Sequence, residues 1–199
     1  MPRRPRKNII SPNTIYHIVC RGNAEKRIFR RSRDYQMLLK IIEKTKKNYP
    51  FYFFTYNFLP NHYHLEIETK TIPISKIMHQ INNAYVKYFR RNYKGSGHIF
   101  QGRFFSNVVN KDSYLREVTR YIDLNAVRAG LARDPKKYKW SSFAIYCQKD
   151  YQGKLIDRER FLKYISNDVE TARKVYVDFV AKGLKSKNKS VNSLGKKMD

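Results

Sequence analysis

Acidic residues and cysteines are scarce in this chain. Asp and Glu number 16 against 42 Lys and Arg, so the formal net charge of the 199 residues is +26. A surplus this large exceeds what solubility requires and indicates a polyanionic partner, with nucleic acid as the first candidate. The two cysteines, Cys20 and Cys147, lie far apart and form no CxxC pair. A disulfide scaffold is therefore excluded, and a reducing cytoplasm is the expected location.

Long apolar runs are also missing. No segment approaches the roughly 20 consecutive apolar residues of a membrane helix, and none follows the basic N-terminus as a signal peptide would require. We expect no membrane partner and no organic cofactor. Aromatic residues, in contrast, make up 15% of the chain. Rings placed among cations suit unpaired nucleic-acid bases, which stack on them while the cations hold phosphates.

Strict alternation from His62 onward indicates a strand with a polar face. Successive strand side chains point to opposite sides, so one face carries His62, His64, Glu66 and Glu68 and the other carries Tyr63, Leu65 and Ile67. Two histidines at i and i+2 point the same way and can reach one divalent ion. The simpler interpretation is a half-buried strand with histidines on its wet face.

The order of elements predicts an α+β fold. Hydrophobic spacing indicates strands at residues 14–20, 51–59, 62–69 and 104–109, and helices at residues 32–48 and 74–92. This β-α-β-β-α-β order is that of a ferredoxin-like core, an antiparallel sheet with two helices on one face. Tyr63, Leu65 and Ile67 should pack under the helices, and the histidine face should stay open. Ser32 is the expected N-cap of the first helix, and Asp112 or Ser113 that of a third helix.

The third helix carries a candidate nucleophile. Tyr121 and Asn125 stand at i and i+4 and therefore share a helix face. Imidazole and oxygen ligands with open positions suit Mg²⁺ or Mn²⁺ holding a phosphate. A tyrosine oxygen that attacked phosphorus would leave a covalent phosphotyrosine and a free 3′-OH. Tyr114, two helical turns earlier, is a rival nucleophile, although packing against the sheet is its simpler role.

At this point the chain resembles a known family. His62-Tyr63-His64 fits the His-hydrophobic-His (HUH) signature of single-strand DNA endonucleases. The chain is similar to the IS200-like Y1 transposases, and within them to the REP-associated tyrosine transposases, across residues 10–146. The motifs that carry the resemblance occur in order at residues 59–64, 97–104, 112–115, 120–130 and 140–142.

The resemblance implies roles for individual residues. It implies that His62 and His64 bind the metal, that Tyr121 is the nucleophile and that Asn125 is a third metal contact. Family members commonly have proline after that asparagine, where this chain has Ala126. Glu66 would be a proton shuttle or an outer contact to the metal, although a solvated strand residue is the simpler interpretation. His17 and His98 are not expected to be ligands. The implied substrate is single-stranded DNA that bears a hairpin.

Basic residues outside the candidate site are expected to contact DNA. Most such cations hold the phosphate backbone without reading sequence, and Arg128 is expected to hold a phosphate near the active site. The set comprises an N-terminal arm, the end of the second helix, the following loop and the end of the third helix, at Arg3, Arg4, Arg6, Arg90, Arg91, Gln101, Arg103 and Arg128.

The chain is expected to comprise four parts: a basic arm at residues 1–9, a catalytic domain at residues 10–146, a helical extension at residues 147–185 and a disordered Lys-rich tail at residues 186–199. Helices are expected in the extension at residues 157–164 and 167–182.

Three functions compete. The leading hypothesis is a metal-dependent DNA strand transferase that uses a tyrosine nucleophile, cuts near a hairpin and rejoins ends. The second is a non-catalytic basic protein that binds structured DNA or RNA, and the third is a nuclease that uses water. The two alternatives predict little dependence on Tyr121. We expect a monomer, with a dimer as the alternative.

Overall fold

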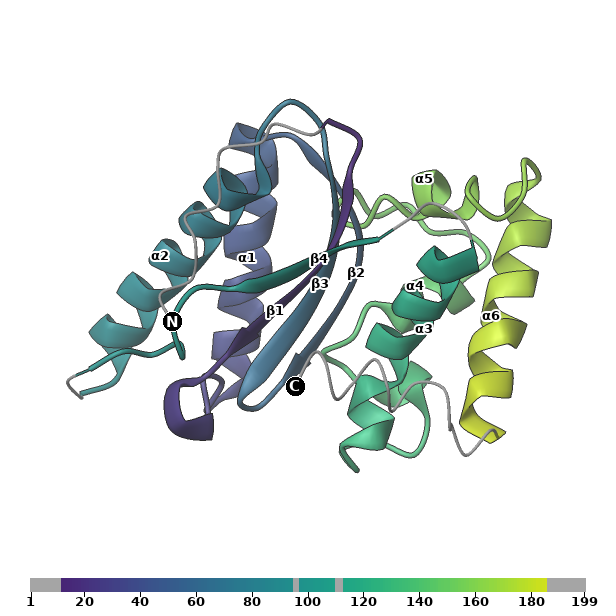
Figure 1. The fold of residues 1–199 in the computed structure, drawn as a ribbon. Helices are drawn as coiled ribbons and strands as arrows, with labels where there is room; N and C mark the ends of the chain where they lie inside the picture. The colour runs from purple at the N-terminus through teal and green to yellow at the C-terminus, as the bar shows by residue number, and fades with distance from the viewer. Residues whose placement is uncertain (1–11, 95–96, 110–112, 186–199) are drawn as a thin grey trace. The chain divides into compact units, whose positions relative to one another are not determined.

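The computed structural model describes residues 12–94, 97–109 and 113–185 of the chain. Its strands are β1 (Ile15–Arg21), β2 (Phe51–Leu59), β3 (His62–Thr69) and β4 (Phe105–Val109) (Figure 1). Its α-helices are α1 (Ser32–Asn48), α2 (Ile74–Asn92), α3 (Ser113–Arg128), α4 (Phe143–Cys147), α5 (Arg158–Leu162) and α6 (Val169–Lys185). Short 3-10 turns cover Asn23–Glu25 and Pro135–Lys137.

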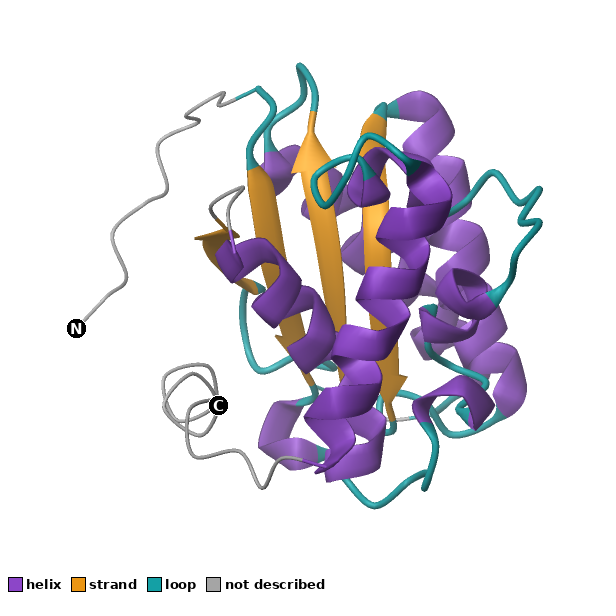
Figure 2. Cartoon of the chain, turned by 90° about the vertical axis from the view of Figure 1, so that its right-hand side faces the viewer, coloured by secondary structure: helices purple, strands orange, loops and turns teal. Residues whose placement is uncertain are grey.

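The four strands form one sheet in the order β2-β3-β1-β4. Strand β1 lies between β3 and β4 and is antiparallel to both, and Figure 2 shows the strands side by side. A tight connection joins β2 to β3, as expected of an antiparallel hairpin. The predicted ferredoxin-like α+β fold is confirmed, because two strand-helix-strand units with this order are its defining topology.

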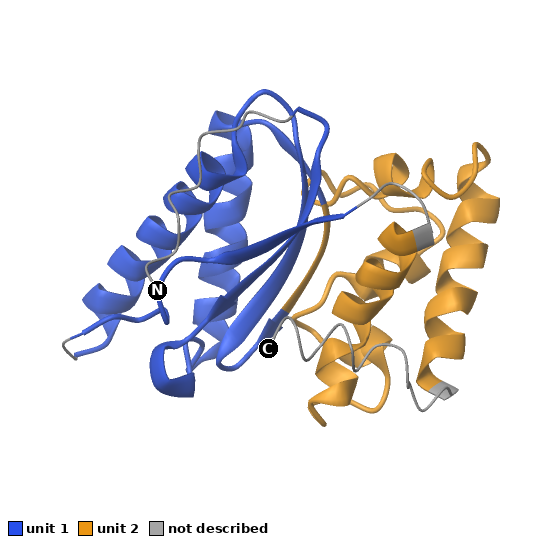
Figure 3. Cartoon of the chain, viewed as in Figure 1, with its two compact units in different colours: residues 1–53, 58–109 blue, residues 54–57, 110–199 orange. Residues whose placement is uncertain are grey.

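Contacts divide the chain into two units (Figure 3). Unit 1 comprises residues 1–53 and 58–109, and unit 2 comprises residues 54–57 and 110–199. The middle of β2 thus belongs to unit 2 by its contacts, although its backbone is part of the sheet. The predicted boundary at residue 146 stays a prediction, as do the basic arm and the tail, which lie outside the described residues.

The core of unit 1 lies between the sheet and the helices α1 and α2, which lie on the same face of it (Figure 1). Tyr63, Leu65 and Ile67 are fully buried, as predicted. The Tyr63 hydroxyl donates a hydrogen bond to Asn82 Oδ1 on α2, which satisfies the polar end of an otherwise apolar ring. Burying each such side chain contributes roughly 1.5–3 kcal/mol relative to exposure.

Helix α1 covers the predicted residues, but its N-cap differs from the prediction. The N-cap is Arg31 rather than Ser32, because the capping carboxylate comes from inside the first turn. Asp34 Oδ2 accepts hydrogen bonds from the backbone N–H groups of Arg30 at 2.8 Å and Arg31 at 2.9 Å. Both N–H groups precede the first helical residue, and Asp34 at the third helical position accepts from them, as the carboxylate of a capping box accepts from the N-cap backbone.

Unit 2 is built on an aromatic core. The rings of Tyr146, Phe161 and Tyr176 lie 4.9–5.3 Å apart in edge-to-face arrangements. The Tyr146 hydroxyl donates to the Phe54 carbonyl at 2.7 Å, so a β2 residue anchors α4. Helix α6 contacts α3, α4 and α5. The two helices predicted after residue 150 are confirmed with shifted ends, whereas the short α4 was not predicted.

No helix in the described part of the chain is both long enough and apolar enough to cross a lipid bilayer.

Candidate active site

His62 and His64 lie on the same face of β3, as the alternation predicts. Their ring centroids are 5.0 Å apart with an interplanar angle of 77°. His62 is half-buried, whereas His64 is only 1% exposed. Across the β1–β3 pairing, His62 stands opposite Arg21 and His64 opposite Val19. The pair therefore sits at one end of an inner strand, where the rigid ladder fixes the direction of both side chains.

The Nδ1 atom of each histidine is engaged. His62 Nδ1 lies 2.7 Å from Asn61 Oδ1. Since an amide oxygen only accepts, His62 donates to it through Nδ1–H. His64 Nδ1 lies 3.0 Å from His17 Nε2 on β1. Metal-binding histidines commonly engage one ring nitrogen with such a partner and bind the ion through the other, and the Nδ1 contacts of both residues fit this pattern.

Burial keeps the inner histidines uncharged. It lowers the pKa of His17 to about 4, and it lowers the pKa of His64 well below its ordinary value, with smaller electrostatic contributions from His17, His62 and Arg21. Loss of hydration disfavours the imidazolium form. Neutral imidazole is the form that binds metals, so at neutral pH no proton has to leave His64 before it can act as a ligand.

The polar face of β3 is not open to water. Glu66 and Glu68, which the alternation placed on a wet face, are both 0% exposed, and the interpretation of Glu66 as a solvated strand residue is wrong. Glu66 stands directly opposite His17 in the register. Period-two alternation tells which side of a sheet a residue takes, but it carries no information on what covers that side.

The donor set fits a divalent ion that keeps open coordination positions. Within the described residues, no group of three or more His, Cys, Asp and Glu side chains could hold a metal. The His62–His64 pair supplies two imidazole nitrogens and leaves the remaining coordination positions to oxygen ligands. Such a mixed set suits Mn²⁺, or Mg²⁺ bound mainly through phosphate oxygens and water.

Helix α3 carries Tyr121, Asn125 and Arg128 on successive turns, so the three residues share a helix face. Tyr121 is 8% exposed, and the Arg128 guanidinium carbon lies 5.1 Å from its ring centroid. A cation at this position stabilises negative charge that develops on the phenolic oxygen. Asn125 and the rival Tyr114 are half-buried.

A network of buried polar side chains fixes α3 at Asp123, which lies between Tyr121 and Asn125. Asp123 is fully buried and accepts hydrogen bonds from the hydroxyls of Thr55 and Tyr176, each at 2.6 Å. Burial raises the pKa of Asp123 to about 7, and the two hydrogen bonds partly oppose that rise. Ser142 Oγ lies 2.7 Å from Thr55 Oγ1 and accepts from the Tyr56 N–H at 2.9 Å. These hydrogen bonds therefore fix the side of α3 that faces away from Tyr121.

The loop before β4 is tied to the histidine end of the sheet. The Gln101 N–H donates to the Arg21 carbonyl at 2.9 Å, and Arg21 stands opposite His62. Gly102 has a φ of +109°, a conformation that side-chain-bearing residues rarely adopt. Gln101 and Arg103 are exposed, so this loop places two predicted DNA-contacting residues next to the β3 start.

A cluster of exposed arginines, termed the basic end, lies at the same end of unit 1. The Pro60 carbonyl in the β2–β3 turn accepts hydrogen bonds from the N–H groups of Ile28 and Phe29. The Arg30 guanidinium stacks over the rings of Phe89 and Tyr93, which joins the α1 start to the α2 end. The basic end comprises Arg27, Arg30, Arg31, Arg33, Arg90 and Arg91. Arg3, Arg4 and Arg6 lie outside the described residues.

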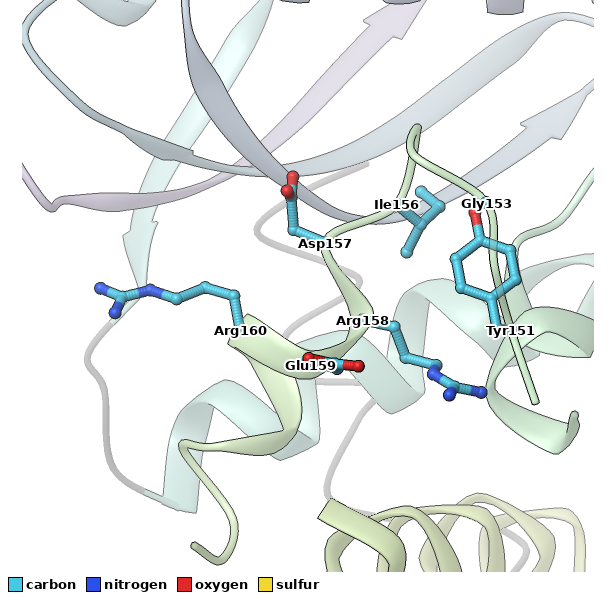
Figure 4. Close-up of a pocket in the computed structure, with 7 residues that line it drawn as sticks. All are labelled: Tyr151, Gly153, Ile156, Asp157, Arg158, Glu159 and Arg160. Atoms are coloured by element: carbon cyan, nitrogen blue, oxygen red, sulfur yellow. The ribbon is translucent and has the colours of Figure 1, made fainter. Parts of the chain in front are cut away.

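Unit 2 has a cavity of about 280 Å³, and none of the residues that line it is a predicted site residue (Figure 4). Tyr151, Ile156 and Arg158 are among its lining residues. The Arg158 guanidinium donates to the Gln148 carbonyl at 2.6 Å and to the Ile145 carbonyl at 3.4 Å. It therefore caps the end of α4, and its burial has a structural explanation.

The sequence did not reveal the residues that contact the predicted site residues and their helix, which are His17, Thr55 and Tyr176. His17 was not expected to be a ligand, and its place beside His64 follows from the register of β1 against β3. Thr55 and Tyr176 gave no signal, because a lone hydroxyl in a strand or helix has no pattern that reveals a distant partner.

Taken together, these features describe a ferredoxin-like protein with a metal-capable histidine pair on an inner strand and a tyrosine-bearing helix. The chain belongs to the IS200-like transposase family, whose sequence profile matches residues 11–125. The predicted family is thereby confirmed. A comparison with curated proteins gave no match.

Among solved structures, the chain is similar to a REP-associated tyrosine transposase bound to a REP hairpin. The TM-score is 0.64 at 21% identity, and the match covers 79% of this chain and 94% of that chain. At this identity the likeness establishes a shared fold. The family match ends at residue 125, so α4, α5 and α6 lie beyond it.

Proposed function

We propose that the protein is a metal-dependent single-stranded DNA endonuclease and strand transferase that cuts near a hairpin. The observation that carries the proposal is the engagement of Nδ1 in both His62 and His64, in a chain that belongs to a transposase family. A binding protein would have no need to direct two imidazole Nε2 atoms to the same side of one strand.

In this proposal His62 and His64 hold Mg²⁺ or Mn²⁺, with Asn125 as a third contact. The bound ion would polarise the scissile phosphate and offset its charge. Tyr121 releases its phenolic proton to solvent water and its oxygen bonds to phosphorus, while the bond from phosphorus to the 3′-oxygen breaks. The departing oxygen takes up a proton and becomes a 3′-OH. A 3′-OH from another end then attacks the 5′-phosphotyrosine in the reverse sense, which rejoins the DNA and frees Tyr121.

Arg128 has a role in the same step. A tyrosine with an ordinary pKa of roughly 10 is a weak nucleophile near neutrality. The guanidinium 5.1 Å from the Tyr121 ring stabilises the phenolate without accepting its proton, since an arginine stays protonated. It can also hold a phosphate of the bound strand, as the sequence suggested.

The basic end and the Gln101–Arg103 loop offer a route for the DNA. Both adjoin the β2–β3 turn that leads into His62. Exposed guanidiniums hold phosphates bidentately, and they fix the position of a strand without reading its bases. We propose that the strand to be cut approaches the histidines from this end of unit 1.

The test uses labelled single-stranded hairpin DNA from the flanks of the protein's own gene, incubated with Mn²⁺ or Mg²⁺. We expect a protein–DNA adduct that survives SDS, that EDTA abolishes and that Tyr121→Phe reduces at least about 1,000-fold, because no other group replaces the attacking oxygen. Tyr114→Phe is the matched control and should leave the adduct intact.

Two other outcomes would contradict the proposal. Tight hairpin binding without any adduct would favour a non-catalytic nucleic-acid-binding protein. Cleavage that persists in Tyr121→Phe without a covalent product would identify a nuclease that uses water.

A further inference from the structure

His17 occupies a special place beside the histidine pair. It lies on β1 opposite Glu66, one diagonal step across the sheet from His64. Its Nε2 is 3.0 Å from His64 Nδ1, and the two rings stack at 5.3 Å with an angle of 14°. His17 is 0% exposed. Diagonal neighbours of an antiparallel pair are within reach of long or aromatic side chains, so the sheet register itself creates this contact.

A hydrogen bond between two neutral imidazoles has a direction. One ring donates N–H and the other accepts with a lone pair. If His17 donated, His64 would accept at Nδ1 and carry its own proton on Nε2, where it could not bind a metal. If His64 donates through Nδ1–H, its Nε2 has the lone pair. Only the second arrangement makes His64 a ligand.

We propose that His17 is a positioning residue, which accepts the Nδ1–H of His64 and so directs the lone pair of His64 Nε2 to the divalent ion. The inference rests on the proposed function, because that function assigns the metal to His64. His62 provides a parallel, since Asn61 Oδ1 accepts its Nδ1–H in the same manner. Partners of this kind fix the tautomer and the ring orientation of metal-binding histidines.

The environment favours this division of roles. Both rings are buried, so the facing nitrogens of His17 and His64, 3.0 Å apart, satisfy each other as donor and acceptor. His17 stands on the central strand β1, which is paired on both sides, and its position is therefore as rigid as that of His64. His17 itself does not contact the substrate in this proposal, and its effect reaches the metal only through His64.

The first experiment measures the tautomer directly in the metal-free wild-type chain. Long-range ¹H–¹⁵N correlation spectra at pH 7 report which nitrogen of each histidine ring bears the proton. We expect His64 to be protonated on Nδ1 and unprotonated on Nε2, and His17 to be unprotonated on Nε2. A His64 ring protonated on Nε2 would overturn the inference, whatever the variants show.

The second experiment measures Mn²⁺ affinity by calorimetry in the absence of DNA. His17→Leu removes the acceptor and should weaken Mn²⁺ binding about 10- to 100-fold. His17→Gln restores a carbonyl acceptor and should lie within a few-fold of wild type. His79→Leu, on exposed α2 surface, is the matched control and should have no effect. Thermal melting of each variant shows whether it is folded.

The outcomes separate this inference from the proposed function. If His64→Ala abolishes Mn²⁺ binding but His17→Leu binds normally, the metal site stands and the role of His17 is refuted. Equal losses in His17→Leu and His17→Gln would also refute it, because packing of the ring and not its acceptor would then matter. If His64→Ala binds Mn²⁺ like wild type, the metal assignment fails, and the inference fails with it.

Discussion

At the scale of single residues, the contact between Arg128 and Tyr121 has a measurable consequence. The guanidinium lies over the ring of Tyr121, where a positive charge favours the phenolate that forms as the bond to phosphorus develops. Both residues are on α3, two turns apart, so the contact depends only on the helix. It therefore persists in any arrangement of the two units.

We predict that Arg128→Gln slows adduct formation about 10- to 100-fold under single-turnover conditions, because the developing negative charge loses its neighbouring cation. Arg128→Lys should give an intermediate rate, since an ammonium keeps the charge but lacks the planar stacking of a guanidinium. Arg133→Gln removes an exposed charge just beyond α3 and should leave the rate unchanged. An unaltered rate of adduct formation in Arg128→Gln would show that Arg128 contributes only packing.

At the scale of elements, Asp34 ties the start of α1 to the end of α2. Its buried carboxylate accepts hydrogen bonds from the Tyr88 hydroxyl at 2.7 Å and the Tyr93 hydroxyl at 2.8 Å, besides those from the backbone N–H groups of Arg30 and Arg31. Burial alone would raise the pKa of Asp34, but the hydrogen bonds from the tyrosines and the backbone outweigh it and the pKa is lowered.

The stability of the fold depends on pH because Asp34 binds a proton less readily in the folded than in the unfolded state. A carboxyl with a depressed pKa in the folded state stabilises the fold above its unfolded pKa of 3.8, and this contribution is lost as the pH falls. We predict that the free energy of unfolding of the wild type decreases between pH 5 and pH 3. Asp34→Asn should be destabilised by about 1–3 kcal/mol at pH 7, from buried donors left unsatisfied, and its decrease with acid should be shallower.

Urea denaturation at several pH values checks this prediction. Asp150→Asn, which neutralises an exposed carboxyl, is the matched control and should follow the wild-type curve. A variant curve parallel to wild type from pH 7 to pH 3 would show that Asp34 does not supply the acid dependence.

Helix α3 is held in unit 2 by elements that lie outside the family match. Tyr176 of α6 donates to Asp123, and the Arg120 guanidinium stacks over Phe179 of α6 at 4.1 Å. Gly183 of α6 lets the two helices approach closely, because a Cβ there would come within 2.9 Å of Arg120 Cδ. The extension therefore has a clear role in unit 2, as the support of the helix that carries Tyr121.

At the scale of the whole molecule, the charge of +26 should make DNA binding strongly dependent on salt. Each phosphate that a cation neutralises releases counterions and adds about 0.7 to the slope of log K against log salt for single strands. We predict that Arg90→Ala with Arg91→Ala reduces the magnitude of that slope by about 1.4 for hairpin DNA with a single-stranded flank, because two phosphate contacts are lost.

Fluorescence anisotropy at several salt concentrations measures the slope. Lys44→Ala with Lys47→Ala changes the net charge equally but lies on the last two turns of α1, away from the basic end, and should alter the slope much less. Equal reductions in both double variants would mean that the DNA responds to net charge and has no defined path over the basic end.

Local spacing along the chain was enough to predict the elements and the faces of the candidate site. Strands repeat every two residues and helices every 3.6, so the side-by-side placement of His62 and His64 and the shared face of Tyr121 and Asn125 follow from local spacing. The order of elements then limited the topology to a ferredoxin-like sheet. Residue types and their order along the chain were sufficient to identify the family.

The surroundings of those residues depend on contacts between distant parts of the chain. The bond from His17 to His64 depends on the register of β1 against β3, and the bonds of Asp123 join residues 68 and 53 positions apart. Burial of Glu66 likewise depends on what packs over a strand face. Local periodicity contains no information on register or on long-range partners, because these are set by the packing of the entire chain.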